Sequence, residues 1–404
     1  MKVHLSLITG IIIIGLLGSC SKKDAPSKNN SDNNIGNNDV SGYDKNFKGI
    51  SGSGFAAAMQ SDGKIIVAGS FGSDSQYSYK VYRLNQDGTV DNTFNIDADK
   101  SWFLNGLSAV AVLNDGRILL GGDFTINGTK KFMVRLSSNG LLDKSFTSPS
   151  FNYIANSQPY INKIIVLSGD RVLVAGSFNT FLSNKVNYNH LIKIDYNGLL
   201  DPDFRLDISI LNGISDVIPL TDGSFYIAGG SHYVTKINKN GAVDASFNFK
   251  ETLNSTLGSG LTGYISSIAL QPDGKLIIGG DFSSIEDKSM RDGIYNYSQI
   301  ARLNIDGSID MSFKASDGVR AKISKVSVLS DGRLLIGRKT DLNAATGNTY
   351  LSLFEKNGEQ NKSFNIGLDN SDVSDIIKQD NNRFILLGIF TDASQNGVIR
   401  INVN

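Results

Sequence analysis

One segment of the chain, residues 265–313, recurs along most of the sequence, and this repetition restricts the fold more than any other feature. The segment reads ISSIALQPDGKLIIGGDF, then a variable spacer, then ARLNIDGSIDMSF. Two apolar runs flank Asp273-Gly274, and two more flank Asp306-Gly307. Asp-Gly between apolar runs is typical of a β-hairpin, because its turn needs a positive φ angle that glycine adopts without steric cost. Each unit therefore predicts four antiparallel strands, in which the first and third turns are tight and the second connection is long.

The first hairpin turn of the unit recurs at intervals of 50 to 58 residues, which makes seven units. The seven turns are Asp62-Gly63, Asp115-Gly116, Gly169-Asp170, Asp222-Gly223, Asp273-Gly274, Asp331-Gly332 and Asn381-Asn382. In most units the strand after this turn ends on paired small residues, such as Gly121-Gly122 and Gly279-Gly280. Paired small residues at a strand end indicate close approach of backbones or sheets.

The second hairpin turn is followed in six units by an aspartate and, three residues later, a phenylalanine. These pairs are Asp91/Phe94, Asp143/Phe146, Asp201/Phe204, Asp244/Phe247, Asp310/Phe313 and the variant Asn361/Phe364. The seventh unit stops at Asn404 after its third strand. The strand that it lacks stands at the other end of the repeats, as GYDKNF over residues 42–47.

This displaced strand favours a closed ring. Four-stranded units with a period near 50 residues are typical of β-propeller blades, and a propeller must join its first blade to its last. An open solenoid would instead need polar capping repeats at both ends, and none is visible. The sequence therefore predicts an all-β fold, a seven-bladed β-propeller of four-stranded antiparallel blades, in which the N-terminal strand completes the last blade and closes the ring.

The repeated unit resembles the delta-60 repeat of bacterial proteins, a family read as β-propellers, and the resemblance covers residues 42–404. It departs from the pattern in three units: the inverted turn Gly169-Asp170, Arg338 in place of the second glycine, and Asn381-Asn382 in place of Asp-Gly. The resemblance implies the fold but no settled activity, and a fold alone does not supply one.

The N-terminal residues predict a secreted, lipid-anchored protein. Lys2 is followed by an apolar run from Leu5 to Leu17 that is short for a membrane span, as in a signal peptide. The sequence Leu17-Gly18-Ser19-Cys20 resembles a bacterial lipobox, which implies cleavage after residues 1–19 and diacylation of Cys20. The alternative is an ordinary secretory signal with a chance cysteine. Because Cys20 is the single cysteine, the mature chain would have no disulfide.

Residues 20–41 would hold the lipidated cysteine and a disordered tether, since they are rich in Ser, Asn, Asp and Lys and have no hydrophobic periodicity. Ser21 after the cysteine resembles outer-membrane sorting, and Lys22-Lys23-Asp24 resembles the export signal of surface lipoproteins in Bacteroidota. We therefore expect an outer-membrane lipoprotein, facing the periplasm or the cell surface, that contacts membrane lipid through acylated Cys20. Residues 42–404 would form the propeller.

Composition and motifs exclude several classes of function. The 39 basic and 39 acidic residues balance, which gives no indication of nucleic-acid binding. His190 and His232 lie in different units without a ligand-spaced companion, and no phosphate loop or zinc signature occurs, so we expect no metal and no cofactor. Asn85, Asp87 and Asp91 share part of a calcium-loop spacing, but the terminal glutamate is missing, and these residue types are also preferred in turns.

The candidate ligand-binding residues are aromatic. In an up-and-down blade the tight turns lie on one face and all long loops on the other, and loops on a rigid scaffold commonly carry binding function. The candidates assigned to these loops are Trp102, Phe103, Tyr77, Tyr79, Tyr153, Tyr188, His190, Tyr233, Tyr295 and Tyr297. Tyrosine and tryptophan combine an apolar face with a polar group, which suits sugar rings and protein surfaces alike. The alternative is that many of them begin third strands or cover the core.

The sequence is consistent with two alternative functions. The favoured one is a monomeric, lipid-anchored binding or scaffold module of the cell envelope that recognises a glycan or an envelope protein through its loop face. The other is a propeller enzyme, a polysaccharide hydrolase or lyase, that uses loop-face carboxylates such as Asp123 and Asp281. These two aspartates follow Gly-Gly at matching positions. Since the repeat itself generates them, no catalytic residue is assigned and the sequence favours a protein that is not an enzyme.

Overall fold

The computed structural model describes part of the chain, and all described residues lie in one compact unit, Asp39–Asn404. They are residues 42–72, 78–96, 102–152, 157–181, 187–207, 213–229, 233–249, 252–254, 263–282, 284–286, 294–296, 299–314, 322–339, 350–366, 371–390 and 397–403. Over these residues the secondary structure is β-strands and turns, and no helix is long and apolar enough to cross a membrane. The predicted signal peptide, Cys20 and the tether of residues 20–41 lie outside the described residues.

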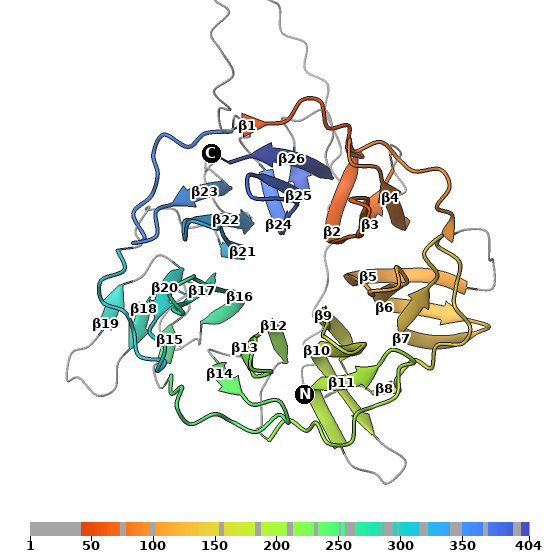
Figure 1. Cartoon of the computed structure of the whole chain (residues 1–404), viewed down its shortest axis with the longest axis horizontal. Helices are drawn as coiled ribbons and strands as arrows, with labels where there is room; N and C mark the ends of the chain where they lie inside the picture. The colour runs from red at the N-terminus through yellow and green to blue at the C-terminus, as the bar shows by residue number, and fades with distance from the viewer. Residues whose placement is uncertain are drawn as a thin grey trace, which may run out of the picture. The chain divides into compact units, whose positions relative to one another are not determined.

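The strands form antiparallel sheets of three or four strands (Figure 1). Three-stranded sheets are formed by β2 (Gly52–Met59), β3 (Ile65–Phe71) and β4 (Ser78–Leu84); by β5 (Trp102–Val112), β6 (Ile118–Ile126) and β7 (Thr129–Leu136); by β12 (Ile214–Pro219), β13 (Phe225–Gly229) and β14 (Tyr233–Ile237); by β16 (Tyr264–Leu270), β17 (Leu276–Asp281) and β20 (Ile300–Leu303); and by β21 (Lys322–Val328), β22 (Leu334–Lys339) and β23 (Leu351–Phe354).

Two sheets have four strands, and one small sheet is additional. The four-stranded sheets are formed by β8 (Phe151–Asn152), β9 (Tyr160–Val166), β10 (Arg171–Phe181) and β11 (Asn187–Asp195), and by β1 (Gly42–Tyr43), β26 (Val398–Asn402), β25 (Arg383–Phe390) and β24 (Ser371–Lys378). The small sheet pairs β15 (Thr252–Asn254), β18 (Ser284–Glu286) and β19 (Ile294–Asn296). It was not expected, because its strands come from two long connections in which the repeat pattern is interrupted.

The two hairpin turns of the unit have the predicted backbone. Gly63 and Gly88 have φ angles of 82° and 83°, and each donates a hydrogen bond to the residue three positions earlier, Gln60 and Asn85. In the inverted turn both Gly169 (φ 70°) and Asp170 (φ 56°) are left-handed, which aspartate tolerates better than most residues. The prediction of paired tight turns is therefore confirmed in these units.

The fourth strand of the unit is shorter than predicted. In six units it is reduced to a single bridge pair, such as Leu84 with Val90 and Leu303 with Ile309. The chain then turns, and the amide of Phe313 donates to the carbonyl of Asp310 at 3.1 Å. The backbone leaves the sheet here because Asp310 forms a turn, in which its carboxylate accepts a hydrogen bond from the amide of Ser312 at 2.9 Å. Phe313 then packs in a cluster with Leu334 and Phe354 of the next unit. The last sheet has β1 in this place, where Gly42 and Tyr43 pair with Asn402 and Ile401 of β26.

A basic residue in the third strand joins the aspartate and the phenylalanine into one structure, which we call the latch. Arg302 Nε donates to Asp310 Oδ2 at 2.8 Å, and its guanidinium lies 4.8 Å from the ring centre of Phe313. Arg302 Nη1 donates to the carbonyl of Lys356, in the next unit, at 2.6 Å. Charge-assisted hydrogen bonds and a cation–π contact are both strong for their size when water is excluded. The latch therefore fastens one unit to the next.

The latch recurs around the chain. Its ion pairs are Arg83–Asp91 (2.7 Å), Arg135–Asp143 (2.8 Å), Lys193–Asp201 (2.9 Å), Lys236–Asp244 (2.9 Å), Arg302–Asp310 (2.8 Å) and Arg400–Asp44 (2.7 Å). The sixth unit has Leu353 and Asn361 at these two positions, so it lost the basic and the acidic member together. Loss of both avoids a buried charge without a partner, which is costly.

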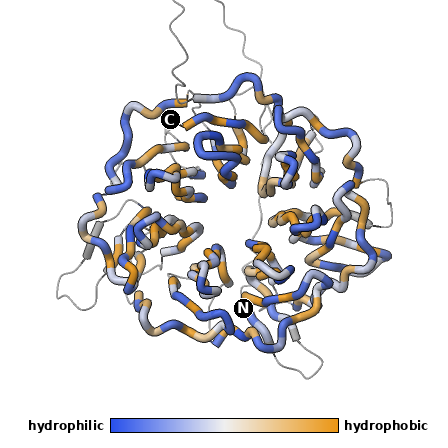
Figure 2. Tube along the Cα trace, viewed as in Figure 1, coloured by the Kyte–Doolittle hydropathy of each residue, from blue (hydrophilic) through white to orange (hydrophobic). Residues whose placement is uncertain are grey.

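Hydrophobic clusters fill the space between neighbouring sheets. One cluster joins Ile66 of β3 to Leu107 of β5 and Leu120 of β6, and Figure 2 shows that apolar residues gather in the sheets while much of the outer connections is hydrophilic. A Cβ atom at Gly279 would lie 2.8 Å from Ile323 of the next sheet, and one at Gly280 would collide with the carbonyl of Tyr264. The paired small residues thus mark close approach on both sides, as predicted.

We expect Arg302→Leu to lower the free energy of unfolding by about 3 kcal/mol, because it leaves buried Asp310 with a single cationic partner, Lys275. The double variant Arg302→Leu/Asp310→Asn reproduces the natural pair of the sixth unit and should cost less than the two single changes added together. The free energies of unfolding of the two single variants and the double variant are measured by urea denaturation, monitored by circular dichroism. Strict additivity of the two single changes would contradict a coupled latch.

Stability should fall in acid because the latch aspartates are ionised in the folded chain. Burial opposes ionisation of Asp310, but hydrogen bonds from Lys275 and Ser312 outweigh it and lower its pKa below the ordinary 3.8. The pKa values of Asp143 and Asp244 are lowered to about 2. The unfolded chain therefore takes up protons at higher pH than the folded one, so stability is full above 3.8 and declines as pH falls toward about 2. The melting temperature of Asp310→Asn should decline less steeply across this pH window than that of the wild type. A wild-type melting temperature that is constant down to about pH 2 would contradict the stabilising role of the ionised latch aspartates.

Candidate binding site

The first strand of every unit carries a β-bulge at the same position. The residues left out of the pairing are Phe55, Ser108, Asn162, Ser215, Ser266, Ser324 and Ser374, in β2, β5, β9, β12, β16, β21 and β24. A bulge increases the local twist of its strand and redirects the side chains beside it. All seven of these residues line one cavity.

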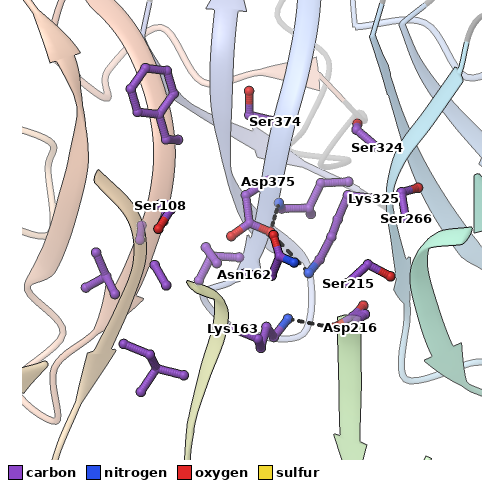
Figure 3. Close-up of a pocket in the computed structure, with 18 of the residues that line it drawn as sticks. Ser108, Asn162, Lys163, Ser215, Asp216, Ser266, Ser324, Lys325, Ser374 and Asp375 are labelled. Carbon is purple, nitrogen blue, oxygen red and sulfur yellow. Dashed lines mark hydrogen bonds and ion pairs between the residues drawn. The ribbon is translucent and has the colours of Figure 1, made fainter. Parts of the chain in front are cut away.

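The cavity has a volume of about 500 Å³ and lies between the innermost strands of the seven units (Figures 1 and 3). Each of those strands contributes at least one lining residue, so the site belongs to the whole repeat array and not to one unit. A volume of this size is within the range of about 300–1,000 Å³ that is usual for small-molecule sites.

Several bulge residues bind the neighbouring unit. Asn162 Nδ2 donates to the carbonyl of Ile214 at 2.7 Å, and Ser215 Oγ donates to the carbonyl of Ile265 at 2.6 Å. Ser266 and Ser324 donate in the same way to the carbonyls of Ile323 and Val373. Each bond crosses to the first strand of the next unit, which satisfies carbonyls at the cavity wall and holds the wall together.

Four charged residues follow the bulges at equivalent positions, namely Lys163, Asp216, Lys325 and Asp375 (Figure 3). Lys163 Nζ lies 3.0 Å from Asp216 Oδ1, and Lys325 Nζ lies 3.3 Å from Asp375 Oδ1. Asp216 is almost fully buried and accepts further hydrogen bonds from Ser267 Oγ and the amide of Ile268, each at 3.1 Å. The site thus contains two ion pairs, each between consecutive units.

The two pairs stabilise the ionised state of one another. Burial opposes the charge on Asp216, but Lys163 and Lys325 outweigh it and lower the pKa of its carboxyl group. Burial also opposes the charge on Lys325, while Asp375 and Asp216 outweigh it and raise the pKa of its amine. Asp216 and Lys325 are therefore charged at neutral pH.

The charged residues of the cavity wall come from later units, and the first two units contribute none. The first two units place Ala56 and Ala109 where later units have a charged residue or Ser267, and Phe55 occupies a bulge position that is serine or asparagine in the others. Val110 also lines the cavity. The remaining five units supply the charges and most of the hydroxyl groups, so a bound molecule would meet two different surfaces.

Three exposed tyrosines lie near the end of the cavity at which the first strands begin. Tyr160 and Tyr264 are the first residues of β9 and β16, two positions before Asn162 and Ser266. Tyr79 of β4 lies 6.2 Å from Phe55, ring centre to ring centre. The three are 55%, 42% and 42% exposed in the order Tyr160, Tyr79, Tyr264. Burial raises the pKa of the hydroxyl groups of Tyr160 and Tyr264.

Of the candidates chosen from the sequence, the structure brings Tyr79 to this site and places others elsewhere. Tyr79 lies in β4, not in the preceding loop as expected. Tyr188 and His190 lie in β11 and are 4% and 6% exposed, with Tyr188 in a hydrophobic cluster. Tyr233 begins β14 and is half-buried. Tyr188 and His190 are two positions apart, so their side chains lie on the same face of β11, which is buried.

The remaining candidates are only partly described. Trp102 and Phe103 begin β5, where they pair with Ile126 and Thr125, and so belong to a strand and not to the connection between units. This first strand is longer than expected because β6 extends alongside it. Tyr295 lies in β19, again within a strand. The side chains of these three residues are not among the described ones, and Tyr77, Tyr153, Tyr297 and His232 lie outside the described residues.

The two aspartates considered for catalysis do not belong to the cavity wall. Asp123 of β6 pairs with Lys130 at 3.0 Å, and Asp281 of β17 pairs with Lys322 at 2.8 Å. They lie in two separate sheets. Within the described part of the chain, no group of three or more His, Cys, Asp or Glu residues is arranged to hold a metal ion.

The four charged residues of the cavity and Tyr264 were not predicted from the sequence. A signal was present, because alignment of the first strands on their hairpin turns puts Lys163, Asp216, Lys325 and Asp375 in one column of otherwise small or apolar residues. The basic residue of the latch was missed in the same way, since it occupies a fixed position four residues before the second turn.

Comparison with known proteins supports the fold. Residues 60–94, 113–146 and 271–313 match the family described as a β-propeller domain of unknown function, DUF5122. No curated protein is detectably similar in sequence to this chain. The matched segments coincide with hairpins and latches of the first, second and fifth units.

Several solved structures have a similar fold at low sequence identity. Virginiamycin B lyase from Staphylococcus aureus is 13% identical with a TM-score of 0.50, covering 87% of this chain and 95% of the lyase chain. The extracellular domain of a one component system from B. thetaiotaomicron is 12% identical (TM-score 0.47; 88% and 40% covered). PorZ, a surface component of the type-IX secretion system of Porphyromonas gingivalis, is 9% identical (TM-score 0.46; 86% and 46% covered).

The antiparallel sheets, the family match and the likeness to the lyase structure define the class of protein. The chain is an all-β protein with a β-propeller fold, as the repeats predicted. At 13% identity the likeness to the lyase structure supports the fold and carries no function to this chain.

Proposed function

We propose that this chain is a lipid-anchored β-propeller of the cell envelope that binds a glycan or a protein partner at the tyrosine-lined end of its central cavity. The observation that carries this proposal is the exposure of Tyr79, Tyr160 and Tyr264, which come from three different units and lie at or next to the starts of their strands, on the loop side. Aromatic rings with a polar end are preferred at recognition surfaces, because they bury much area at little cost in conformational entropy.

The proposal includes a ring of seven blades, each with three full strands and a fourth that is short. Support comes from the two ends of the chain. β1 pairs with β26, Arg400 Nη2 lies 2.7 Å from Asp44 Oδ2, and Arg400 Nη1 donates to the carbonyl of Gln86 in the first unit at 2.7 Å. β2 also contacts β24 and β25. A latch of the same composition as the internal ones would thus close the ring.

The envelope location rests on the N-terminal sequence. The apolar run from Leu5 to Leu17, the small residues before Cys20 and the polar residues after it are the features of a lipoprotein leader and tether. A tether of this composition would let the propeller rotate freely above the membrane. The recognition surface could then face a partner in the same envelope.

Replacement of Cys20 by serine should release the protein from membranes. The thiol is the acylation site in this proposal, and serine cannot form the thioether. Expression in a bacterial host that processes lipoproteins, followed by detergent partitioning and mass spectrometry of the N-terminus, measures the outcome. An unmodified cysteine in the wild-type protein, or membrane retention of the serine variant, would contradict the anchor.

The triple variant Tyr79→Ala/Tyr160→Ala/Tyr264→Ala should lose partner binding at least tenfold while keeping the melting temperature close to that of the wild type. Binding is measured with the full chain in detergent against a glycan array and by crosslinking in its native envelope. Tyr196→Ala is the matched control, because Tyr196 is 41% exposed and lies at a third-to-fourth-strand turn, on the opposite side. Equal binding by the triple variant and the control would overturn the recognition surface.

A further inference from the structure

We infer that the central cavity itself is a binding site for a single ring of a neutral saccharide, with the ring's apolar face toward Phe55 and its hydroxyl groups toward the two ion pairs. This inference deepens the proposed function and rests on it, since the same end of the cavity would receive the ligand. Three features of the cavity support this assignment: its balanced charge, its hydrogen-bonding capacity and the apolar residues of the first two units.

The charge of the cavity favours an uncharged ligand. Lys163, Asp216, Lys325 and Asp375 contribute two positive and two negative charges, held as ion pairs at 3.0 Å and 3.3 Å. Lys378, the last residue of β24, also borders the cavity, but it is exposed and therefore hydrated. A charged ligand would gain attraction from one member of each pair and repulsion from the other. A neutral ligand has no such conflict.

The ion pairs keep hydrogen-bonding capacity that a polyhydroxylated ligand could use. An ammonium group has three donors, and a carboxylate can accept about four hydrogen bonds. The side chains of Lys163, Lys325 and Asp375 line the cavity and remain 32%, 18% and 19% exposed, so each side chain is partly accessible. Hydroxyl groups both donate and accept, and so they fit alternating ammonium and carboxylate groups better than a ligand that only donates or only accepts.

The opposite wall fits the apolar face of a sugar ring. Phe55, Ala56, Ala109 and Val110 line it, and Phe55 is continuous with Tyr79 through ring contact at 6.2 Å. A pyranose has C–H groups on a face and hydroxyl groups around its rim, which matches one apolar wall beside one polar wall. The cavity volume of about 500 Å³ leaves room for a ring and ordered water.

The first measurement is binding of the full chain in detergent to two matched sets of oligosaccharides, neutral glucans of one to six rings and oligogalacturonates of the same lengths. We expect saturable binding of neutral glucans by isothermal titration calorimetry and at least tenfold weaker binding of the galacturonates. Galacturonate binding equal to or tighter than glucan binding would overturn the inference. The inference would also be overturned if the chain bound neither set and bound no glycan on a wider array of neutral glycans.

Substitutions in the cavity wall test whether the saccharide binds in the cavity. Lys325→Met/Asp375→Leu removes an ion pair without changing net charge and should weaken glucan binding at least tenfold, as should Phe55→Ala on the other wall. The matched control is Arg333→Met/Asp331→Leu, which removes an ion pair of 2.6 Å at a first-to-second-strand turn and should leave binding unchanged. Melting temperatures establish that each variant is folded. If the double variant does not fold, the single variant Ser374→Ala, which removes one hydroxyl group of the wall, is used in its place to test the location.

The outcomes separate this inference from the proposed function. If the triple tyrosine variant loses its partner while the cavity variants bind as the wild type does, the recognition surface stands and the cavity is not the site. If the cavity variants lose glucan binding and the tyrosine variant keeps it, the cavity is the site and the tyrosine surface is refuted. If neither set of variants changes binding, both proposals are overturned.

Discussion

The latch between consecutive units is the interaction on which the rest of the structure depends. A sheet of three or four strands cannot bury both of its faces alone, so each unit is stable only when it is held against its neighbours. The latch orients each unit against the next, because Arg302 contacts Asp310 and Phe313 in its own unit and the carbonyl of Lys356 in the next unit. Hydrophobic clusters between the sheets supply most of the free energy, but apolar contact does not specify the angle between sheets.

The cavity follows from the same repetition applied to the inner strands. Every first strand has a bulge at one position. In four units the bulge residue donates a hydrogen bond to the next unit, and in six of the seven the residue after it lines the cavity. Repeat proteins tolerate variation at such positions because the fold is held elsewhere, at the latches and between the sheets. The wall could therefore acquire Lys163, Asp216, Lys325 and Asp375 in some units and Ala56 and Ala109 in others without loss of the architecture.

The candidate site could be predicted only in part from sequence, and particular residues show why. Tyr79 was chosen correctly for exposure, whereas Tyr188 and His190 are buried in β11. All three were selected by residue type and by distance from a turn. Exposure depends on which side of a strand a residue occupies, and a shift of one position reverses that side. The bulges introduce such shifts in the first strands, and a bulge has no residue signature as strong as Asp-Gly.

By itself the sequence determined the repeat, its hairpins, the β-propeller class and the aspartate and phenylalanine of each latch. These features depend on local backbone preference and on recurrence, both of which can be read along the chain. Only the tertiary structure decided which residues of different units meet, as with Lys163 and Asp216 or Arg302 and Lys356. Such contacts join residues about 50 or more positions apart, and their partners are set by the twist and the angle between packed sheets, which no single unit encodes.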